Sequence, residues 1–174
     1  MPADHELFHA ERHALGLLRV GQAGSVLMLE ALTAPVARSL ATALAAIDPW
    51  QRMAIPADDL LRFLLDHDPA CHRFAITLGG RLVGVVAVRD PFLHGPYLNL
   101  LAVLPDWQGL GIGSAVLAWL EARSRGRRRN LFLCVSTHNP RAAAFYRAHG
   151  YVEVGLIEGL ALDLSDELLM RKRL

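Results

Sequence analysis

The chain has 174 residues, of which 53% are hydrophobic and 20% are charged, and its formal net charge is +1. This near-neutral balance argues against a nucleic-acid-binding surface, and no apolar run approaches the ~20 residues needed to cross a bilayer. The N-terminus lacks the basic and apolar regions of a secretory signal, and the only two cysteines, Cys71 and Cys134, lie in different segments. We therefore expect a cytoplasmic protein with reduced thiols and no disulfide framework.

The first 24 residues are interpreted as an N-terminal extension, with a helix followed by a short strand from Leu15 to Val20. His5-Glu6-Leu7-Phe8-His9 matches the H-E-x-x-H zinc-protease pattern, and on a helix His5, His9 and His13 share one face. His13 lies ~12 Å along the helix axis from His5, which is too far to complete a zinc site, and no other third ligand follows. We therefore expect a solvated terminal helix or incidental metal affinity, and no metal cofactor.

The next part of the chain alternates apolar segments with turn signals. Gly79-Gly80 between two apolar runs predicts a hairpin, and the Pro- and Gly-rich stretch from Asp90 to Pro96 predicts a turn. The predicted elements are a strand from Ser25 to Ala31, helices from Pro35 to Ile47 and from Pro56 to Asp66, and hairpin strands from Arg73 to Leu78 and from Arg81 to Arg89.

A glycine-rich loop then separates a strand-like run, Tyr97 to Leu104, from an amphipathic helical run, Ser114 to Arg125. Three alternate glycines leave the backbone N–H groups accessible at a helix N-terminus, where the helix dipole favours anions, so the loop predicts a phosphate cradle. A dinucleotide-binding loop needs wider glycine spacing and a later acidic residue, and a P-loop needs a lysine where Gly113 stands. The remaining alternative is a glycine turn that binds no ligand.

After this helix, the chain gives a short buried strand from Leu131 to Val135 and a helix that begins at the capping pair Asn139-Pro140 and ends at Gly150. Strands from Tyr151 to Glu158 and from Glu167 to Arg173 follow. The strand–helix–strand order around the glycine loop implies one parallel strand pair with a right-handed crossover.

Two segments now carry a family resemblance. Residues 100–113 (LLAVLPDWQGLGIG) resemble the acetyl-CoA-binding signature of the GCN5-related N-acetyltransferases (GNAT), and residues 139–151 (NPRAAAFYRAHGY) resemble that family's second signature. The resemblance covers residues 25–174 and implies one domain there, preceded by the extension 1–24. It implies an α+β fold with a central, mostly antiparallel sheet that has one parallel strand pair and helices on both faces.

The resemblance also implies the chemistry. An amine attacks the thioester of acetyl-CoA directly in a ternary complex, with no metal. The acceptor is left open among a protein N-terminus, a lysine and a small-molecule amine, and so is the choice between a monomer and a homodimer. No nucleic acid or membrane is expected as a partner. A second hypothesis, an acyl-CoA-binding regulatory module without catalysis, shares the cofactor cradle and differs only at the chemistry.

The cofactor-binding residues follow from the two signatures. The backbone of the strand before the loop should pair with the pantetheine arm, and the backbone N–H groups of the loop should bind the pyrophosphate. Arg141 or Arg147 could meet the 3′-phosphate of CoA, whereas the cluster from Arg123 to Arg129 complements a helix C-terminus. The expected cofactor-binding residues are Leu101, Ala102, Val103, Gln108, Gly109, Leu110, Gly111, Ile112, Gly113, Ser114, Asn139, Arg141, Ala142, Phe145 and Tyr146.

Tyr146 is the expected general acid, because its phenol is protonated at neutral pH and the family's tyrosine approaches the cofactor sulfur. Asn139 lies seven residues earlier and so shares its helix face. The general base stays open: His94 has a suitable intrinsic pKa, and Glu30, Glu158 or a water chain are alternatives. Cys134 is a less favoured covalent carrier, and the loops 48–56 and 90–96 are expected to line the acceptor site.

Overall fold

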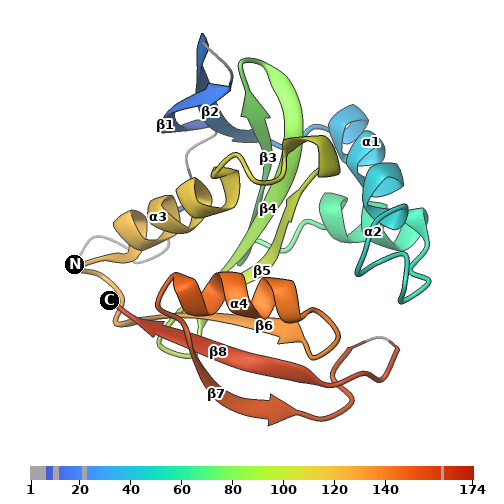
Figure 1. Ribbon diagram of the computed structural model, residues 1–174, viewed down its shortest axis with the longest axis vertical. Helices are drawn as coiled ribbons and strands as arrows, with labels where there is room; N and C mark the ends of the chain where they lie inside the picture. Colours follow the sequence, from blue (N-terminus) through green and yellow to red (C-terminus); the bar gives the residue numbers. More distant parts are fainter. Residues whose placement is uncertain (1–6, 10–11, 21–22, 162) are drawn as a thin grey trace.

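The protein is described here by a computed structural model, which places residues 7–9, 12–20, 23–161 and 163–174 (Figure 1). In chain order, the elements are β1 (Arg12–Val20), β2 (Ala23–Ala31), α1 (Ala34–Ala45), α2 (Ala57–Leu65), β3 (Cys71–Leu78), β4 (Arg81–Phe92), β5 (Gly95–Val103), a short 3-10 helix η1 (Pro105–Trp107), α3 (Ile112–Ser124), β6 (Asn130–Ser136), α4 (Pro140–Ala148), β7 (Val152–Ile157) and β8 (Glu167–Arg173).

The strands form one sheet in the order β1-β2-β3-β4-β5-β6-β8-β7. Every neighbouring pair is antiparallel except β5 and β6, which are parallel because the crossover through α3 joins them. The predicted α+β class, with a mostly antiparallel sheet and one parallel pair, is confirmed.

Helices cover both faces of this sheet, as the family resemblance implied (Figure 1). On one face, α3 and α4 pack into the larger core, which includes the fully buried Leu117 and Leu120 of α3 and Ala143 of α4. On the other face, α1 and α2 pack into a smaller core against Val85 and Ala102. None of the described helices has the length and apolar character needed to cross a membrane.

In the N-terminal extension, the predicted strand from Leu15 to Val20 is confirmed as part of β1, but the predicted helix is not found among the residues that the structure places there. Residues 7–9 form a bend and residues 12–20 form strand β1, so no helix occurs in the described part of the extension. His13 lies opposite Leu29 on β2, and its ring contacts Phe74 and Trp119. The predicted helix with His5, His9 and His13 on one face is therefore wrong at His13, which lies on a strand. His5 lies outside the described residues. Burial and, to a lesser degree, Arg123 lower the pKa of His13.

The predicted turn from Asp90 to Pro96 is shorter in the structure. Strand β4 continues to Phe92 and β5 starts at Gly95, so only Leu93 and His94 form the turn. The Phe92 ring packs on Tyr97 and Phe132. These aromatic contacts hold the hairpin tip in extended pairing, which the Pro and Gly content of the segment did not indicate.

The contribution of the larger core to stability can be tested with two leucines of opposite exposure. Leu117→Ala removes a side chain that is 0% exposed, so we expect it to lower the free energy of unfolding by about 2–5 kcal/mol. Leu17→Ala, at a leucine that is 73% exposed, is the matched control and should change it by less than about 0.5 kcal/mol. Equal effects of the two substitutions in chemical denaturation would contradict this assignment of the core.

Candidate active site

The candidate site begins where β5 and β6 part. These strands pair only at Tyr97–Phe132 and Leu98–Leu133, although β5 runs on to Val103 and β6 to Ser136. Beyond Leu98, the edge of β5 that faces β6 has no strand partner. Backbone N–H and C=O groups on such an edge need a partner, so a ligand can take the place of the missing strand.

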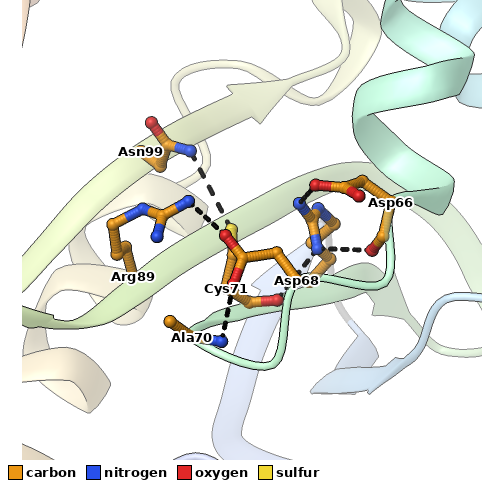
Figure 2. Close-up of polar contacts among 7 residues, drawn as sticks. Asp66, Asp68, Ala70, Cys71, Arg89 and Asn99 are labelled. Atoms are coloured by element: carbon orange, nitrogen blue, oxygen red, sulfur yellow. Dashed lines mark hydrogen bonds and ion pairs between the residues drawn. The ribbon is translucent and has the colours of Figure 1, made fainter.

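A bulge on β5 coincides with this point. Val88 of β4 pairs with Leu98 and Ala87 pairs with Leu100, which leaves Asn99 as the extra residue. A bulge bends and twists its strand, and it therefore helps to turn β5 away from β6. The Asn99 amide donates to Sγ of Cys71 at 3.9 Å (Figure 2).

A polar network beside the bulge fastens the neighbouring strands. Asp68, in the loop before β3, accepts hydrogen bonds from the backbone N–H of Ala70 and from Arg89 of β4 (Figure 2). The same two contacts, in that order, lower the pKa of Asp68. Asp66 and Arg73 add a second ion pair on this side of the sheet at 3.3 Å. These contacts join the loop before β3 to β3 and β4, and they lie outside the slot that β5 and β6 leave between them beyond Leu98.

A cavity of about 680 Å³ lies where the two strands diverge. Its walls come from the end of β5, η1, the start of α3, the end of β6, α4, the α1–α2 loop and the β7–β8 loop. The lining residues are Ile47, Asp48, Pro49, Trp50, Gln51, Arg52, Met53, Leu101, Ala102, Val103, Pro105, Gln108, Gly113, Ser136, His138, Asn139, Arg141, Ala142, Phe145, Tyr146 and Asp163.

The glycine loop forms the entry to α3. Gly111 is the N-cap residue with φ +82°, a left-handed conformation that favours glycine, and no side chain caps the helix there. The first N–H groups of α3 have no intrahelical acceptor, so this end of the helix is suited to an anion. Gly113 serves a different purpose, because a Cβ there would stand 3.0 Å from Cζ of Phe145 on α4. The loop therefore combines an uncapped helix end with close packing of α3 against α4.

The second signature forms α4 as the sequence predicted. The Asn139 side chain caps the helix by accepting a hydrogen bond from the Ala142 N–H at 3.0 Å, and Pro140 occupies the first turn. Asn139 and Tyr146 both line the cavity, which agrees with their shared helix face. Burial raises the pKa of Tyr146 to about 12, so its hydroxyl stays protonated at neutral pH.

Ser114 and His149 join α3 to α4. Nδ1 of His149 lies 2.8 Å from the Phe145 carbonyl and Nε2 lies 2.9 Å from Oγ of Ser114. Since a carbonyl only accepts, the neutral ring carries its proton on Nδ1 and the Ser114 hydroxyl donates to Nε2. The Ser114 side chain is thus engaged with α4, and its backbone N–H is the group that remains for a cofactor.

The structure brings ten of the expected cofactor-binding residues to the cavity wall and leaves five positions of the glycine loop and the first turn of α3 off it. Gln108 lines the cavity and also donates from Nε2 to the Val103 carbonyl at 3.0 Å, which closes the loop onto β5. The positions that do not line the cavity are Gly109, Leu110, Gly111, Ile112 and Ser114.

None of the three residues considered as a general base lines the cavity. His94 is exposed in the β4–β5 turn, seven residues along the strand from Leu101, which is ~23 Å in extended chain. Glu30 lies on β2, where it pairs with Arg12 and accepts a hydrogen bond from Thr77. Glu158 is exposed just after β7. The structure thus separates all three from the cavity wall.

The arginines also divide into different roles. Arg141 lines the cavity, whereas Arg147 forms an exposed ion pair with Glu153. In the cluster at the end of α3, Arg123 donates to the Leu7 carbonyl at 2.8 Å and Arg128 pairs with the buried Asp90 at 3.1 Å. These two side chains fasten neighbouring segments, which is more than the interaction with the helix dipole that the sequence suggested.

Sequence reasoning missed several residues of the cavity wall. Ser136, His138 and Asp163 had no assigned role, and the α1–α2 loop was placed only in outline. His138 directly precedes the recognised cap Asn139, so its place near the site could have been predicted from the sequence. Asp163 reaches the wall only because the β7–β8 loop folds back, and no local pattern indicates that. Among the described residues, no group of three or more His, Cys, Asp or Glu side chains is arranged to hold a metal ion.

Comparison with known proteins agrees with this geometry. The sequence matches the acetyltransferase (GNAT) family over residues 37–151. An acetyltransferase from Thermus thermophilus is 26% identical, with 85% of this chain and 97% of that chain covered and a TM-score of 0.69. No curated protein matches the chain at a significant level.

Two further solved structures share the fold at lower identity. A spermidine N-acetyltransferase chimera from Vibrio cholerae and hSSAT is 21% identical, covers 84% of this chain and 95% of its own, and has a TM-score of 0.67. Mycobacterium smegmatis RimJ in complex with CoA-disulfide is 19% identical, covers 92% and 90%, and has a TM-score of 0.68. With its family match extending over most of the sequence and its sheet parting at the cavity, the chain belongs to the GNAT acetyltransferase family.

Proposed function

We propose that the protein transfers an acetyl group from acetyl-CoA to a primary amine, by direct attack of the amine in a ternary complex. The observation that carries the proposal is the unpaired edge of β5, which faces a cavity between the uncapped start of α3 and Tyr146. The acceptor class, whether a protein N-terminus, a lysine or a small amine, belongs to the proposal as an open choice.

Each part of the donor has a matching part of the site. The backbone of Leu101 to Val103 pairs with the pantetheine amides as an added strand would. An N–H of this edge also stabilises the charge that develops on the thioester oxygen. The N–H groups at the start of α3 hold the pyrophosphate, and Arg141, which lines the cavity as Arg52 also does, is the cation on the second signature for a further phosphate.

Tyr146 is the proposed proton donor to the departing thiolate. Because its pKa is raised to about 12, the phenol carries its proton throughout the physiological range. Cys134 is not proposed as an acetyl carrier, since burial raises the pKa of its thiol and keeps it in the less nucleophilic form.

Acetyl-CoA should stabilise the protein against unfolding, by about 2.7 kcal/mol when the ligand is 100-fold above Kd. NAD and ATP should not do so. Gly111→Val should abolish this stabilisation, because a side chain there opposes φ +82° and obstructs the loop. Gly126→Val is the matched control, since Gly126 has φ +79° and equally open surroundings but lies at the far end of α3. The measurement is a thermal melt with and without acetyl-CoA, and no stabilisation of the wild type would contradict the proposal.

Tyr146→Phe should lower kcat by ~10²-fold or more and leave the Kd for acetyl-CoA nearly unchanged, since only one hydroxyl is removed. Tyr151→Phe is the control, because Tyr151 is also buried and its ring lies 5.8 Å from that of Tyr146, but it does not line the cavity. Steady-state thiol release with a panel of amines measures the rate. A variant with unchanged turnover would show that Tyr146 is structural. Lost acetyl-CoA binding would make Tyr146 a cofactor contact, and if no acceptor were found the non-catalytic module would be favoured.

The tyrosines give a test that does not depend on activity. Burial raises the pKa of all three, Tyr97, Tyr146 and Tyr151. We expect little phenolate absorbance from the folded protein at pH 10.5, whereas the unfolded chain titrates near pH 10. The stability linked to Tyr146 should therefore be present below pH ~10 and be lost as pH rises through about 12. One phenol that ionises near pH 10 in the folded state would contradict the burial of that residue.

A further inference from the structure

The strand pairing at the end of β6 places a carboxylate next to the cavity. Ser136, at the end of β6, lines the cavity, and it pairs directly with Glu167, the first residue of β8. Directly paired residues of an antiparallel ladder point to the same face, with Cβ atoms ~5 Å apart. Glu167 does not itself line the cavity, but unlike His94, Glu30 and Glu158 it is paired directly with a residue that does.

The alternation of side chains along β6 and β8 shows on which face of the sheet Ser136 and Glu167 lie. Leu133, Val135 and Met170 belong to the core under α3 and α4, so Ser136 and Glu167 lie on the opposite face, the one that α1 and α2 cover further along the sheet. Tyr146 approaches from α4. The carboxylate and the phenol thus come to the opening between β5 and β6 from opposite faces of the sheet.

The surroundings of Glu167 leave its carboxylate available. Several other acids are neutralised by a cation: Glu30 by Arg12, Asp90 by Arg128 and Glu121 by Lys172. In the described part of the chain, Glu167 has no ion pair with an arginine or lysine.

The titratable groups that face Glu167 come from three elements: Tyr97 of β5, Cys134 of β6 and Asp163 of the β7–β8 loop. Burial raises the pKa of Glu167, and the Asp163 charge raises it further. A carboxylate with a raised pKa is a stronger proton acceptor.

The backbone holds Glu167 in this position. The carbonyl of Asp166, the preceding residue, accepts hydrogen bonds from the N–H of Thr137 at 3.1 Å and from its hydroxyl at 3.2 Å. These bonds join the start of β8 to the end of β6. The Ser136 oxygen in turn accepts from the His138 N–H at 3.2 Å, which ties the end of β6 to the start of the next turn.

We propose that Glu167 is the general base of the transfer, with its carboxylate, next to the cavity-lining Ser136, accepting the proton of the acceptor amine directly or through one water. As the new N–C bond forms, the C–S bond breaks, the amine proton passes to Glu167 and the thiolate takes the Tyr146 proton. Glu167 then loses its proton to solvent and Tyr146 regains one. This inference rests on the proposed function and assigns the step that the sequence left open.

Glu167→Gln tests the assignment, because it keeps the shape of the side chain and removes the proton acceptor. We expect kcat/KM for thiol release to fall by ~10²-fold, with unchanged affinity for acetyl-CoA. Its pH profile should also lose the acidic limb, which is the fall in rate at low pH as the base becomes protonated. Glu153→Gln is the matched control on neighbouring β7. Its ion pair with Arg147 is exposed, so this variant should keep both the rate and the pH profile.

Asp163→Asn provides a second readout that a structural role of Glu167 would not affect. Removing the Asp163 charge lowers the pKa of Glu167, so the acidic limb of kcat/KM should move to lower pH. Asp163 also interacts with the cavity-lining His138, so His138→Gln, which should keep the acidic limb, is the control, and an unmoved limb in Asp163→Asn contradicts the assignment even if Glu167→Gln does not fold. The assay uses spermidine, N-α-acetyl-lysine and a short peptide with a free N-terminus as acceptors.

The outcomes separate the two proposals. If the wild type binds acetyl-CoA and acetylates none of the acceptors, the proposed function fails and the inference falls with it. If the wild type is active but Glu167→Gln retains its rate and acidic limb, or Asp163→Asn leaves the limb in place, then Glu167 is not the base and the transferase assignment stands.

Discussion

The parallel pairing of β5 with β6 extends over only two residue pairs, and the position of the cavity depends on that short contact. If the two strands stayed paired to their ends, the backbone edge of Leu101 to Val103 would be occupied and no ligand could pair with it. The bulge at Asn99 and the crossover through α3 place the parting of the strands next to the glycine loop. One topological feature thus positions the slot between β5 and β6, the uncapped start of α3 and α4 together.

Different elements form the two sides of this slot between β5 and β6. Helices α3 and α4 are held to each other by the Ser114–His149 hydrogen bond and by Phe145 packed on Gly113, so the loop and Tyr146 keep a fixed relation. The α1–α2 loop and the β7–β8 loop close the other side of the cavity. In the proposed reaction, the proton donor and the proton acceptor reach the thioester from opposite faces, which suits a direct transfer without an enzyme-bound acetyl group.

Local sequence signals predicted most of the helices and strands, whereas the fold class and much of the cavity came from the family resemblance. The glycine loop, the Asn139-Pro140 cap and the apolar run before the loop each form a contiguous segment whose conformation depends on nearby residues. The structure of the N-terminal extension was harder to predict, because its histidine spacing suggested a helix. Pairing with β2 instead makes residues 12–20 a strand. Asp163 and Glu167 could not be placed from the sequence, since their position depends on a loop that folds back to Thr137.

The central claim is that the open edge of β5 receives the pantetheine arm as an added strand. Hydrogen exchange on the wild-type protein, with and without saturating acetyl-CoA, tests this claim at the level of single amides. We predict that acetyl-CoA slows exchange within residues 99–103 and at the first N–H groups of α3. Exchange at Tyr97 and Leu98, which already pair with β6, should change little. Slowed exchange elsewhere in the chain, with none in residues 99–103, would contradict the account.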